Sequence, residues 1–200
     1  MTDHGEQIVG LYQRNARVWA SDRGDRLIEG AWLDRFLGII PKAPLILDIG
    51  CGSGKPIGRY LIEKGCVVTG VDSSPEMIAI ATAHLPAAHW HVADMRTLSL
   101  TKKFHGLLAW DSFFHLCHED QRRMFPIFGE HSQPGAALMF TSGPAQGVAM
   151  GVYAGEPLYH ASLDPEEYRA LLEVNDFSLV EHAVEDPNCG RRTIWLAQRR

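Results

Sequence analysis

The sequence predicts an α/β protein whose mostly parallel sheet is covered by helices on both faces. Apolar runs typical of buried strands alternate with helical patterns between residues 45 and 142, as expected for repeated βαβ units. The first of these runs, in "LILDIGCGSGKPIGRYLIEKG" (45–65), passes through a glycine-rich turn into a helix. The last two expected strands are separated only by "EDPNCG", which is short enough for an antiparallel hairpin.

Two amphipathic helices are expected before this alternation begins, at residues 3–20 and 25–39. Pro41 and Pro44 then interrupt the chain. One face of the first helix is apolar and consists of Ile8, Leu11, Tyr12, Ala16 and Trp19.

The alternation places the remaining elements in order. Strands are expected at "PLILDIG", "CVVTGVD", "AHWHVAD", "HGLLAWDSFF" and "AALMFTSG", with helices at 55–64, 75–84 and 119–130 between them. A glycine-rich segment, 143–160, interrupts the rhythm before a helix at 165–174 and strands at 177–184 and 192–198. Because ligands of such sheets bind beyond the carboxyl ends of the strands, we expect function in the loops that follow them.

Composition and charge restrict the class of protein. With 200 residues, 46% of them hydrophobic and 22% charged, the chain is expected to form one globular domain. A net charge of -5 and the lack of a basic stripe argue against a nucleic-acid partner. Four widely spaced cysteines without a CxxC pair predict reduced thiols and a cytoplasmic location. No apolar stretch approaches the roughly 20 residues of a membrane helix, so no membrane association is expected.

The glycine-rich turn does not fit the two commonest nucleotide-binding motifs. In a phosphate loop Ser or Thr should follow Gly54-Lys55, but Pro56 does. Ile49 occupies the position of that motif's first glycine. The dinucleotide motif Gly-x-Gly-x-x-Gly also fails, because its third glycine is replaced by Lys55 or Ile57, depending on where the motif is started.

The motif that is present is Asp48-x-Gly50-x-Gly52-x-Gly54, with an acidic residue at the end of the first strand. Glycine permits positive φ angles and a close approach of a ligand to the backbone. The carboxylate of Asp48 could accept a hydrogen bond either from a ligand amine or from the N–H groups of its own loop.

Further acidic residues end the second and third strands. Asp72 can accept both hydroxyls of a ribose in a bidentate arrangement. Asp94 can accept an adenine N–H while Met95 covers the ring with a soft apolar surface. Structural alternatives stay open for all three. Asp72 could cap the next helix, as Ser73 and Ser74 could. Asp94 could be only a turn residue, and Met95 could be only a core residue.

These motifs together resemble the class I S-adenosylmethionine-dependent methyltransferases, small-molecule type. The resemblance covers roughly residues 40–200 and rests on "LDIGCGSG", "GVDSSPEMI", "WHVADMRTL" and "FHGLLAWDSFFHL". The N-terminal "LYQRNARVWA" is similar to the helix that closes over the cofactor in many members. The resemblance implies a Rossmann-like three-layer sandwich with a seven-stranded sheet of order 3-2-1-4-5-7-6, in which strand 7 is antiparallel.

The resemblance also divides the chain by role. It implies a single methyltransferase domain, 1–200, in which residues 1–40 form a helical lid and 41–142 the cofactor-binding half. Residues 143–160 would form a flexible flap and 161–200 the C-terminal helix and hairpin.

S-adenosylmethionine is the cofactor that the resemblance implies, with S-adenosylhomocysteine as product. Asp48, Gly50 and Gly52 would hold its methionine end, and the backbone carbonyl of Trp110 would meet its amino group. The resemblance also implies that Asp72 binds the ribose of the cofactor and that Asp94 and Met95 bind its adenine. The complete set expected to bind the cofactor is Tyr12, Trp19, Asp48, Gly50, Gly52, Asp72, Ser73, Asp94, Met95 and Trp110.

The acceptor side is less explicit in the sequence. "AWDSF" replaces the Asn/Asp-Pro-Pro-Tyr that marks methylation of exocyclic amines on nucleic acids, which favours a small-molecule acceptor. Asp111 suggests a magnesium site, but the next strand end, "TSGPAQG", has no carboxylate, so we expect no metal and an acceptor contact instead. His115, Cys117 and His118 lack further ligands, and the two histidines are interpreted as surface residues at the start of a helix.

Two histidines are candidates for a general base, because histidine is best matched to neutral pH. His115 shortly follows the fourth strand, and His160 lies in "GEPLYHASLDPEEY". Either could instead stabilise the core or a loop. The glycine-rich segment 143–160 is expected to close over the acceptor as a flexible flap. Its Tyr153 and Tyr159 are expected to contact the acceptor.

Two other functions remain open, and the sequence leaves the oligomeric state and the acceptor undetermined. A nicotinamide-dependent oxidoreductase would share the acid at Asp72 but needs the missing third glycine. A non-catalytic S-adenosylmethionine-binding protein would keep the strand-end motifs and lose the chemistry of the acceptor pocket.

Overall fold

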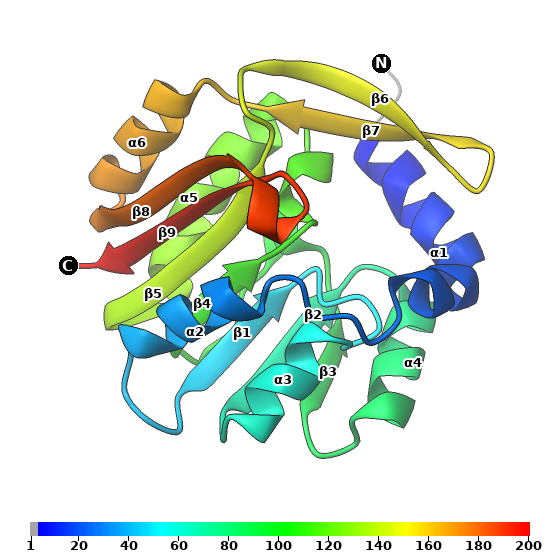
Figure 1. Ribbon diagram of the computed structural model, residues 1–200, viewed down its shortest axis with the longest axis horizontal. Coiled ribbons are helices and arrows are strands. Elements are labelled where there is room, and N and C mark those ends of the chain that lie inside the picture. The colour runs from blue at the N-terminus through cyan, green and yellow to red at the C-terminus, as the bar shows by residue number, and fades with distance from the viewer. Residues whose placement is uncertain (1–3) are drawn as a thin grey trace.

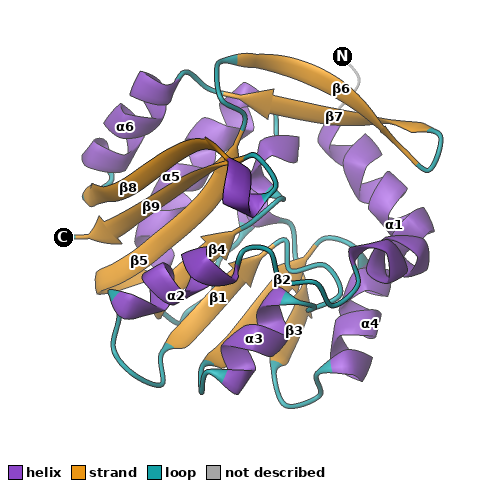
Figure 2. Ribbon diagram, viewed as in Figure 1, coloured by secondary structure: helices purple, strands orange, loops and turns teal. Residues whose placement is uncertain are grey.

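The computed structural model of the protein describes residues 4–200, with a central seven-stranded sheet covered by helices on both faces (Figure 1, Figure 2). The strand order is β3-β2-β1-β4-β5-β9-β8. The pairs from β3 to β5 are parallel, whereas β9 is antiparallel to both β5 and β8. The predicted order with an antiparallel last strand is therefore confirmed.

Each strand and helix lies close to its expected place. The sheet consists of β1 (Leu45–Ile49), β2 (Val67–Asp72), β3 (His89–Val92), β4 (Phe104–Ala109), β5 (Ser132–Ser142), β8 (Phe177–Asp186) and β9 (Arg192–Arg199). The α-helices are α1 (His4–Arg23), α2 (Gly30–Gly38), α3 (Ile57–Glu63), α4 (Pro75–His84), α5 (His118–His131) and α6 (Pro165–Val174). Short 3₁₀ turns are η1 (Met95–Thr97), η2 (Phe113–His115) and η3 (Pro187–Cys189).

The two N-terminal helices differ most from the expected boundaries. The helix expected at 3–20 continues to Arg23, while residue 3 lies outside the described residues. The second helix starts at Gly30 rather than at residue 25. The carbonyl of Glu29 accepts hydrogen bonds from the N–H groups of Trp32 and Leu33. These bonds form the first turn of α2, where N–H groups lack partners within the helix.

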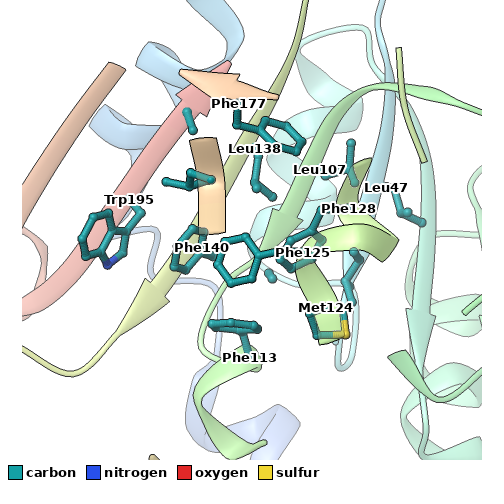
Figure 3. Packing of buried hydrophobic residues seen from close by; sticks show 14 of the residues in the cluster. Leu47, Leu107, Phe113, Met124, Phe125, Phe128, Leu138, Phe140, Phe177 and Trp195 are labelled. Carbon is teal, nitrogen blue, oxygen red and sulfur yellow. The ribbon is translucent and has the colours of Figure 1, made fainter. Parts of the chain in front are cut away.

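Alternating side chains of the sheet build a core on each face. On one face α5 and α6 cover an aromatic cluster in which Phe113, Phe125, Phe128 and Phe140 lie together (Figure 3). The ring of Phe140 stacks on Trp195 from β9, with 5.8 Å between the ring centroids. On the other face α2 and α3 cover a second apolar cluster. Burial on both faces explains why the parallel strands are nearly continuous apolar runs.

The glycine-rich segment 143–160 is paired as β-structure over most of its length. It forms most of an antiparallel hairpin of β6 (Gly147–Tyr153) and β7 (Glu156–Ser162), which extends from the end of β5 toward α1 (Figure 1). The two turn residues, Ala154 and Gly155, have φ angles of 50° and 79°, and positive φ at both positions is typical of tight hairpin turns. The sequence analysis assigned no strands to this segment, in which cross-strand pairing outweighs the low strand preference of glycine. That the segment acts as a flexible flap over the acceptor stays a prediction.

Within residues 4–200, no helix is both long enough and apolar enough to cross a membrane.

The aromatic cluster should carry much of the stability of the fold. Replacing the fully buried Phe140 by alanine leaves a cavity in the core, so we expect Phe140→Ala to lower the free energy of unfolding by about 3–5 kcal/mol. Urea denaturation followed by circular dichroism measures the change. Val174→Ala is the control, because Val174 is 80% exposed and its truncation should change stability by less than about 0.5 kcal/mol. Equal effects of the two substitutions would contradict the assignment of the core.

Candidate active site

The carboxyl ends of β1, β2 and β4 and the loop after β3 meet at one edge of the sheet, where they form a pocket that α1 covers. Every residue expected to bind the cofactor lines this pocket: Tyr12, Trp19, Asp48, Gly50, Gly52, Asp72, Ser73, Asp94, Met95 and Trp110. Asp111 and His115 line it as well. The structure thus brings together residues from five separate segments of the chain.

The glycine loop after β1 is packed too tightly for larger residues. Gly50 and Gly52 have φ angles of 77° and 53°, which side chains disfavour. A Cβ atom on Gly50 would lie 2.3 Å from Cβ of Ser112, and one on Gly52 would lie 2.9 Å from the ring of Trp19. The glycines therefore let η2 and the lid helix α1 approach the loop backbone directly.

The carboxylate of Asp72 holds this loop in place. Its Oδ2 accepts a hydrogen bond from the N–H of Gly52 at 3.0 Å, and its Oδ1 accepts one from the N–H of Ser74 at 2.9 Å. Ser74 rather than Asp72 caps α4, because its hydroxyl accepts from the N–H of Met77 at 3.2 Å. Each carboxylate oxygen keeps a second lone pair, so the ribose contact of Asp72 stays a prediction compatible with this geometry.

Asp48 is the most deeply buried acid of the pocket, with 3% of its surface exposed. Burial raises the pKa of its carboxyl group to about 7, and the nearby charges of Asp72 and Glu29 act in the same direction. No hydrogen bond to this carboxylate is found within residues 4–200. The N–H group of Gly52, which the sequence offers as a possible partner of Asp48, donates to Asp72 instead. The carboxylate of Asp48 is therefore open to a cationic ligand.

Asp94 combines a turn role with a place in the pocket. Its Oδ1 accepts a hydrogen bond from the N–H of Arg96 at 2.9 Å, and both carboxylate oxygens contact the Arg96 guanidinium. Burial raises the pKa of Asp94, but the hydrogen bonds and charge of Arg96 outweigh it, and the net pKa is lowered. Met95 is half-buried and packs against the aromatic cluster while lining the pocket. Both open alternatives for these residues are therefore partly realised, and their adenine contact stays a prediction.

Asp111 is engaged by an arginine that the sequence analysis did not connect with it. Its carboxylate forms an ion pair with Arg192 of β9, with 2.6 Å between Oδ2 and Nη2. Asp111 has a φ of 48° at the end of β4, and its N–H donates to Oγ1 of Thr141 at 2.9 Å. Its lone pairs are thus largely occupied, although it borders the pocket. Among the described residues, no group of three or more His, Cys, Asp and Glu side chains is arranged to hold a metal ion.

His115 is buried, with 6% of its surface exposed, so its interpretation as a surface residue was wrong. Its Nδ1 lies 2.9 Å from the carbonyl oxygen of Tyr159, which can only accept, so Nδ1 carries the proton. Its Nε2 then accepts from the hydroxyl of Tyr12 at 3.0 Å. Burial lowers the pKa of His115 to about 4, so the imidazole is neutral at pH 7. His118 is also partly buried, and its Nε2 contacts the carbonyls of Gly147 and Ser162.

Three predicted residues of the hairpin do not line the main pocket. Tyr153 stacks on Tyr12, with 6.4 Å between ring centroids, and its hydroxyl donates to Asp22 at 3.2 Å. Tyr159 is buried against Ile8 of α1. Both tyrosines therefore join the hairpin to the lid, and a contact with the acceptor stays a prediction.

His160, the third of these residues, lies next to His115 but lines a different space from the cofactor pocket. Its ring is 4.9 Å from that of His115 and 5.1 Å from that of Phe114, measured between centroids, and it lines a second cavity beside the end of β5. No hydrogen bond to the His160 ring is found within the described residues.

Three cationic residues of the pocket were missed by the sequence analysis: Arg23, Lys55 and Arg96, the last paired with Asp94. Arg23 forms an ion pair with Glu29, whose side chain is fully buried. Arg23 lies beyond the end of the helix expected at 3–20. The apolar pattern used to predict that helix does not identify a charged residue of the pocket. Lys55 follows Gly54 in the loop that does not fit the phosphate-loop motif, and that motif gives no other signal for it.

Comparison with known protein families matches residues 46–135 to the methyltransferase domain. The chain is 31% identical over 139 residues to dTDP-3-amino-3,4,6-trideoxy-alpha-D-glucopyranose N,N-dimethyltransferase from Streptomyces venezuelae, covering 68% of this chain and 56% of that protein. It is 27% identical over 139 residues to dTDP-4-amino-2,3,4,6-tetradeoxy-D-glucose N,N-dimethyltransferase from Saccharopolyspora spinosa, covering 68% of this chain and 53% of that one. The chain spans about half the length of these relatives.

Solved structures share the fold over nearly the whole chain. Magnesium protoporphyrin IX methyltransferase from Synechocystis PCC 6803, with bound S-adenosylmethionine, has a TM-score of 0.77 at 17% identity. The match covers 100% of this chain and 99% of that one. An amino pentose methyltransferase from Micromonospora echinaspora, also with bound S-adenosylmethionine, has a TM-score of 0.72 at 18% identity, covering 92% of this chain and 96% of that one.

Because the pKa of Asp48 is raised, replacing its carboxyl group by a neutral amide should stabilise the protein more at high pH than at low pH. A carboxyl group with a folded pKa of about 7 contributes stability below its ordinary pKa of 3.8, and this contribution is lost as the pH rises through 7. Asp48→Asn removes the titration, so its free energy of unfolding relative to the wild type should rise by up to about 4 kcal/mol between pH 4 and pH 8. Denaturant unfolding at both pH values measures the difference.

Asp34→Asn is the matched control for this measurement, because hydrogen bonds from Tyr60 and Lys64 lower the pKa of Asp34. Its contribution to stability is present above the ordinary pKa and lost as the pH falls, so the relative stability of this variant should not rise with pH. A pH-independent difference between Asp48→Asn and the wild type would contradict the raised pKa.

Proposed function

From the match of residues 46–135 to the methyltransferase domain family, we propose that the protein transfers a methyl group from S-adenosylmethionine to a small-molecule acceptor. The observation that carries the proposal is that all residues expected to bind the cofactor line one pocket at the sheet edge. The relatives act, by their names, on acceptors as different as amino sugars and magnesium protoporphyrin, so the acceptor itself does not follow from them.

The charges of the pocket fit the charged groups of S-adenosylmethionine. The buried carboxylate of Asp48 would attract its ammonium and sulfonium groups, and the cationic side chain of Arg23 would attract its carboxylate. The unused lone pairs of Asp72 would accept the ribose hydroxyls, and Asp94 and Met95 would contact the adenine. The tight glycine loop leaves its backbone free to approach the methionine end.

The lid and the glycine loop would orient the reaction and exclude water from it. When bound, the cofactor supplies an electrophilic methyl group on sulfur. Tyr12 and Trp19 of α1 cover the pocket, and holding the acceptor in line with the methyl group could supply roughly 7–11 kcal/mol of the barrier.

The two candidate histidines would have different roles. His115 is neutral, and both its ring nitrogens are hydrogen-bonded, so it would position Tyr12 and β7 rather than take a proton. His160 is half-buried, and its pKa is lowered by burial, which the charge of Asp111 partly opposes. Because its ring nitrogens have no hydrogen-bond partner within residues 4–200, His160 would be the general base for the acceptor.

The finer parts of the proposal concern location and partners. Four free cysteines support a cytoplasmic location, because thiols stay reduced there. The net charge of -5 supports an acceptor other than a nucleic acid. The rival nicotinamide-dependent oxidoreductase is disfavoured because the loop lacks the third glycine of that motif. The other alternative is a non-catalytic S-adenosylmethionine-binding protein, and detection of methyl transfer would exclude it.

Asp72→Ala tests the cofactor assignment directly. Loss of the charge-assisted hydrogen bonds to the ribose, and of the bonds that hold Gly52, should weaken binding of S-adenosylhomocysteine by roughly 2–4 kcal/mol, or about 30- to 1000-fold. Isothermal titration calorimetry measures the affinity, and circular dichroism checks the fold. Asp34→Ala, an exposed acid remote from the pocket, should bind like the wild type. Wild-type affinity in Asp72→Ala would reject the ribose contact.

His160→Asn tests the base. Removal of the imidazole should slow methyl transfer roughly 10²- to 10⁴-fold while the affinity for S-adenosylhomocysteine stays within a few-fold. Because the pKa of His160 is lowered, the wild-type rate should fall as the pH drops below about 6.5, and this limb should be absent in the variant. His115→Asn should retain that limb. An unchanged pH–rate profile in His160→Asn would show that His160 does not act as the base.

A further inference from the structure

A second cavity lies between the end of β5 and the hairpin, next to the cofactor pocket. It has a volume of ≈ 320 Å³ and opens to solvent, since Pro144, Ala145, Val148 and Ala149 in its wall are exposed. The rings of Phe114, His115 and His160 separate the two spaces, with 4.8 to 5.1 Å between neighbouring centroids. His115 lines the cofactor pocket, whereas Phe114 and His160 line the second cavity. The two spaces thus lie on either side of one layer of rings, and methyl transfer between them would have to pass the edge of this layer.

Among the described residues, the walls of this cavity carry no charged side chain. They come from Phe114 and from parts of the segments 142–149 and 160–162, and none of the lining residues is Asp, Glu, Lys or Arg. The whole segment 143–162 contains no lysine or arginine, and its one acid, Glu156, is paired with Arg14 near the hairpin turn. A diphosphate in the cavity would therefore have no cation to bind it.

The hydroxyl groups of the cavity are already hydrogen-bonded. Oγ of Ser162 accepts from the N–H of Gly143 at 2.6 Å. Oγ of Ser142 donates to the carbonyl of Gly143 at 2.8 Å and accepts from Nε1 of Trp195 at 3.0 Å. Of the polar side chains that line the cavity within residues 4–200, only His160 has no hydrogen bond. The site thus offers apolar walls and one free imidazole.

We propose that this cavity is the acceptor site and that it takes an uncharged planar ring compound bearing a hydroxyl or amino group, rather than a nucleotide-linked sugar. The proposal rests on the proposed methyltransferase function and narrows it. Phe114 and His160 provide ring faces for stacking, and glycine and alanine at 143, 145 and 149 leave room for a flat molecule. The relatives that act on dTDP-sugars differ from this chain in that respect, because their acceptors carry a diphosphate.

In the proposed methyl transfer, His160 takes up the proton that the acceptor loses. A lone pair of the acceptor oxygen or nitrogen forms the new bond to the methyl carbon. The carbon–sulfur bond breaks, and its electron pair stays on sulfur as the thioether of S-adenosylhomocysteine. The proton of the acceptor O–H or N–H group moves to the free nitrogen of the His160 ring. No metal, oxidant or reductant is required.

Binding measured in the presence of S-adenosylhomocysteine tests the acceptor class without a known substrate. The ring probes are phenol, aniline, indole and 8-hydroxyquinoline, the charged probe is dTDP-glucose, and ligand-observed NMR reports binding. Ala149 pairs with His160 across the hairpin and shares its face, so Ala149→Trp should fill the cavity. Val152→Trp is the matched control on the opposite face of β6, where Val152 is 74% exposed.

We expect at least one ring probe to bind the wild type and Val152→Trp equally, to bind Ala149→Trp at least 10-fold more weakly, and dTDP-glucose not to bind. The affinity for S-adenosylhomocysteine should stay within two-fold in both variants. Binding of dTDP-glucose, or ring binding that is absent or unaffected by Ala149→Trp, would overturn the acceptor assignment and leave the proposed function standing. Failure of the wild type to bind S-adenosylhomocysteine would overturn the proposed function, and the acceptor assignment with it.

Discussion

The two hydrogen bonds accepted by the carboxylate of Asp72 hold the candidate site in shape. One comes from Gly52 in the loop after β1, and the other comes from Ser74 at the start of α4. Because Asp72 ends β2, which pairs with β1, these bonds join two strand ends and one helix start at a single point. The glycine loop is held with positive φ angles and its backbone bare, so α1 can close directly over it. The pocket depends on this arrangement.

A buried imidazole joins the parts that cover the pocket. His115 donates to the carbonyl of Tyr159 in β7 and accepts from the hydroxyl of Tyr12 in α1, so the lid helix and the hairpin are held through one side chain. Its ring also forms part of the wall between the pocket and the second cavity.

The strand-end residues could be predicted because their signals are local. Apolar runs that end in Asp48, Asp72 and Asp94 mark strands whose carboxyl ends must meet at one edge of a parallel sheet. The environment of these acids could not be predicted, because it depends on contacts distant in sequence. Arg192 approaches Asp111 from β9, 81 residues away, and Arg23 reaches the pocket from beyond the expected helix.

The sequence by itself determined the order of the elements, the central sheet and the position of the strand-end pocket, because hydrophobic periodicity and glycine spacing are properties of neighbouring residues. Only the tertiary structure decided that segment 143–160 forms a hairpin and that His115 is buried and neutral. Strand pairing and burial depend on residues far apart in the chain. For the same reason only the fold distinguishes His115, which is hydrogen-bonded on both ring nitrogens, from His160, which has no hydrogen-bond partner within the described residues.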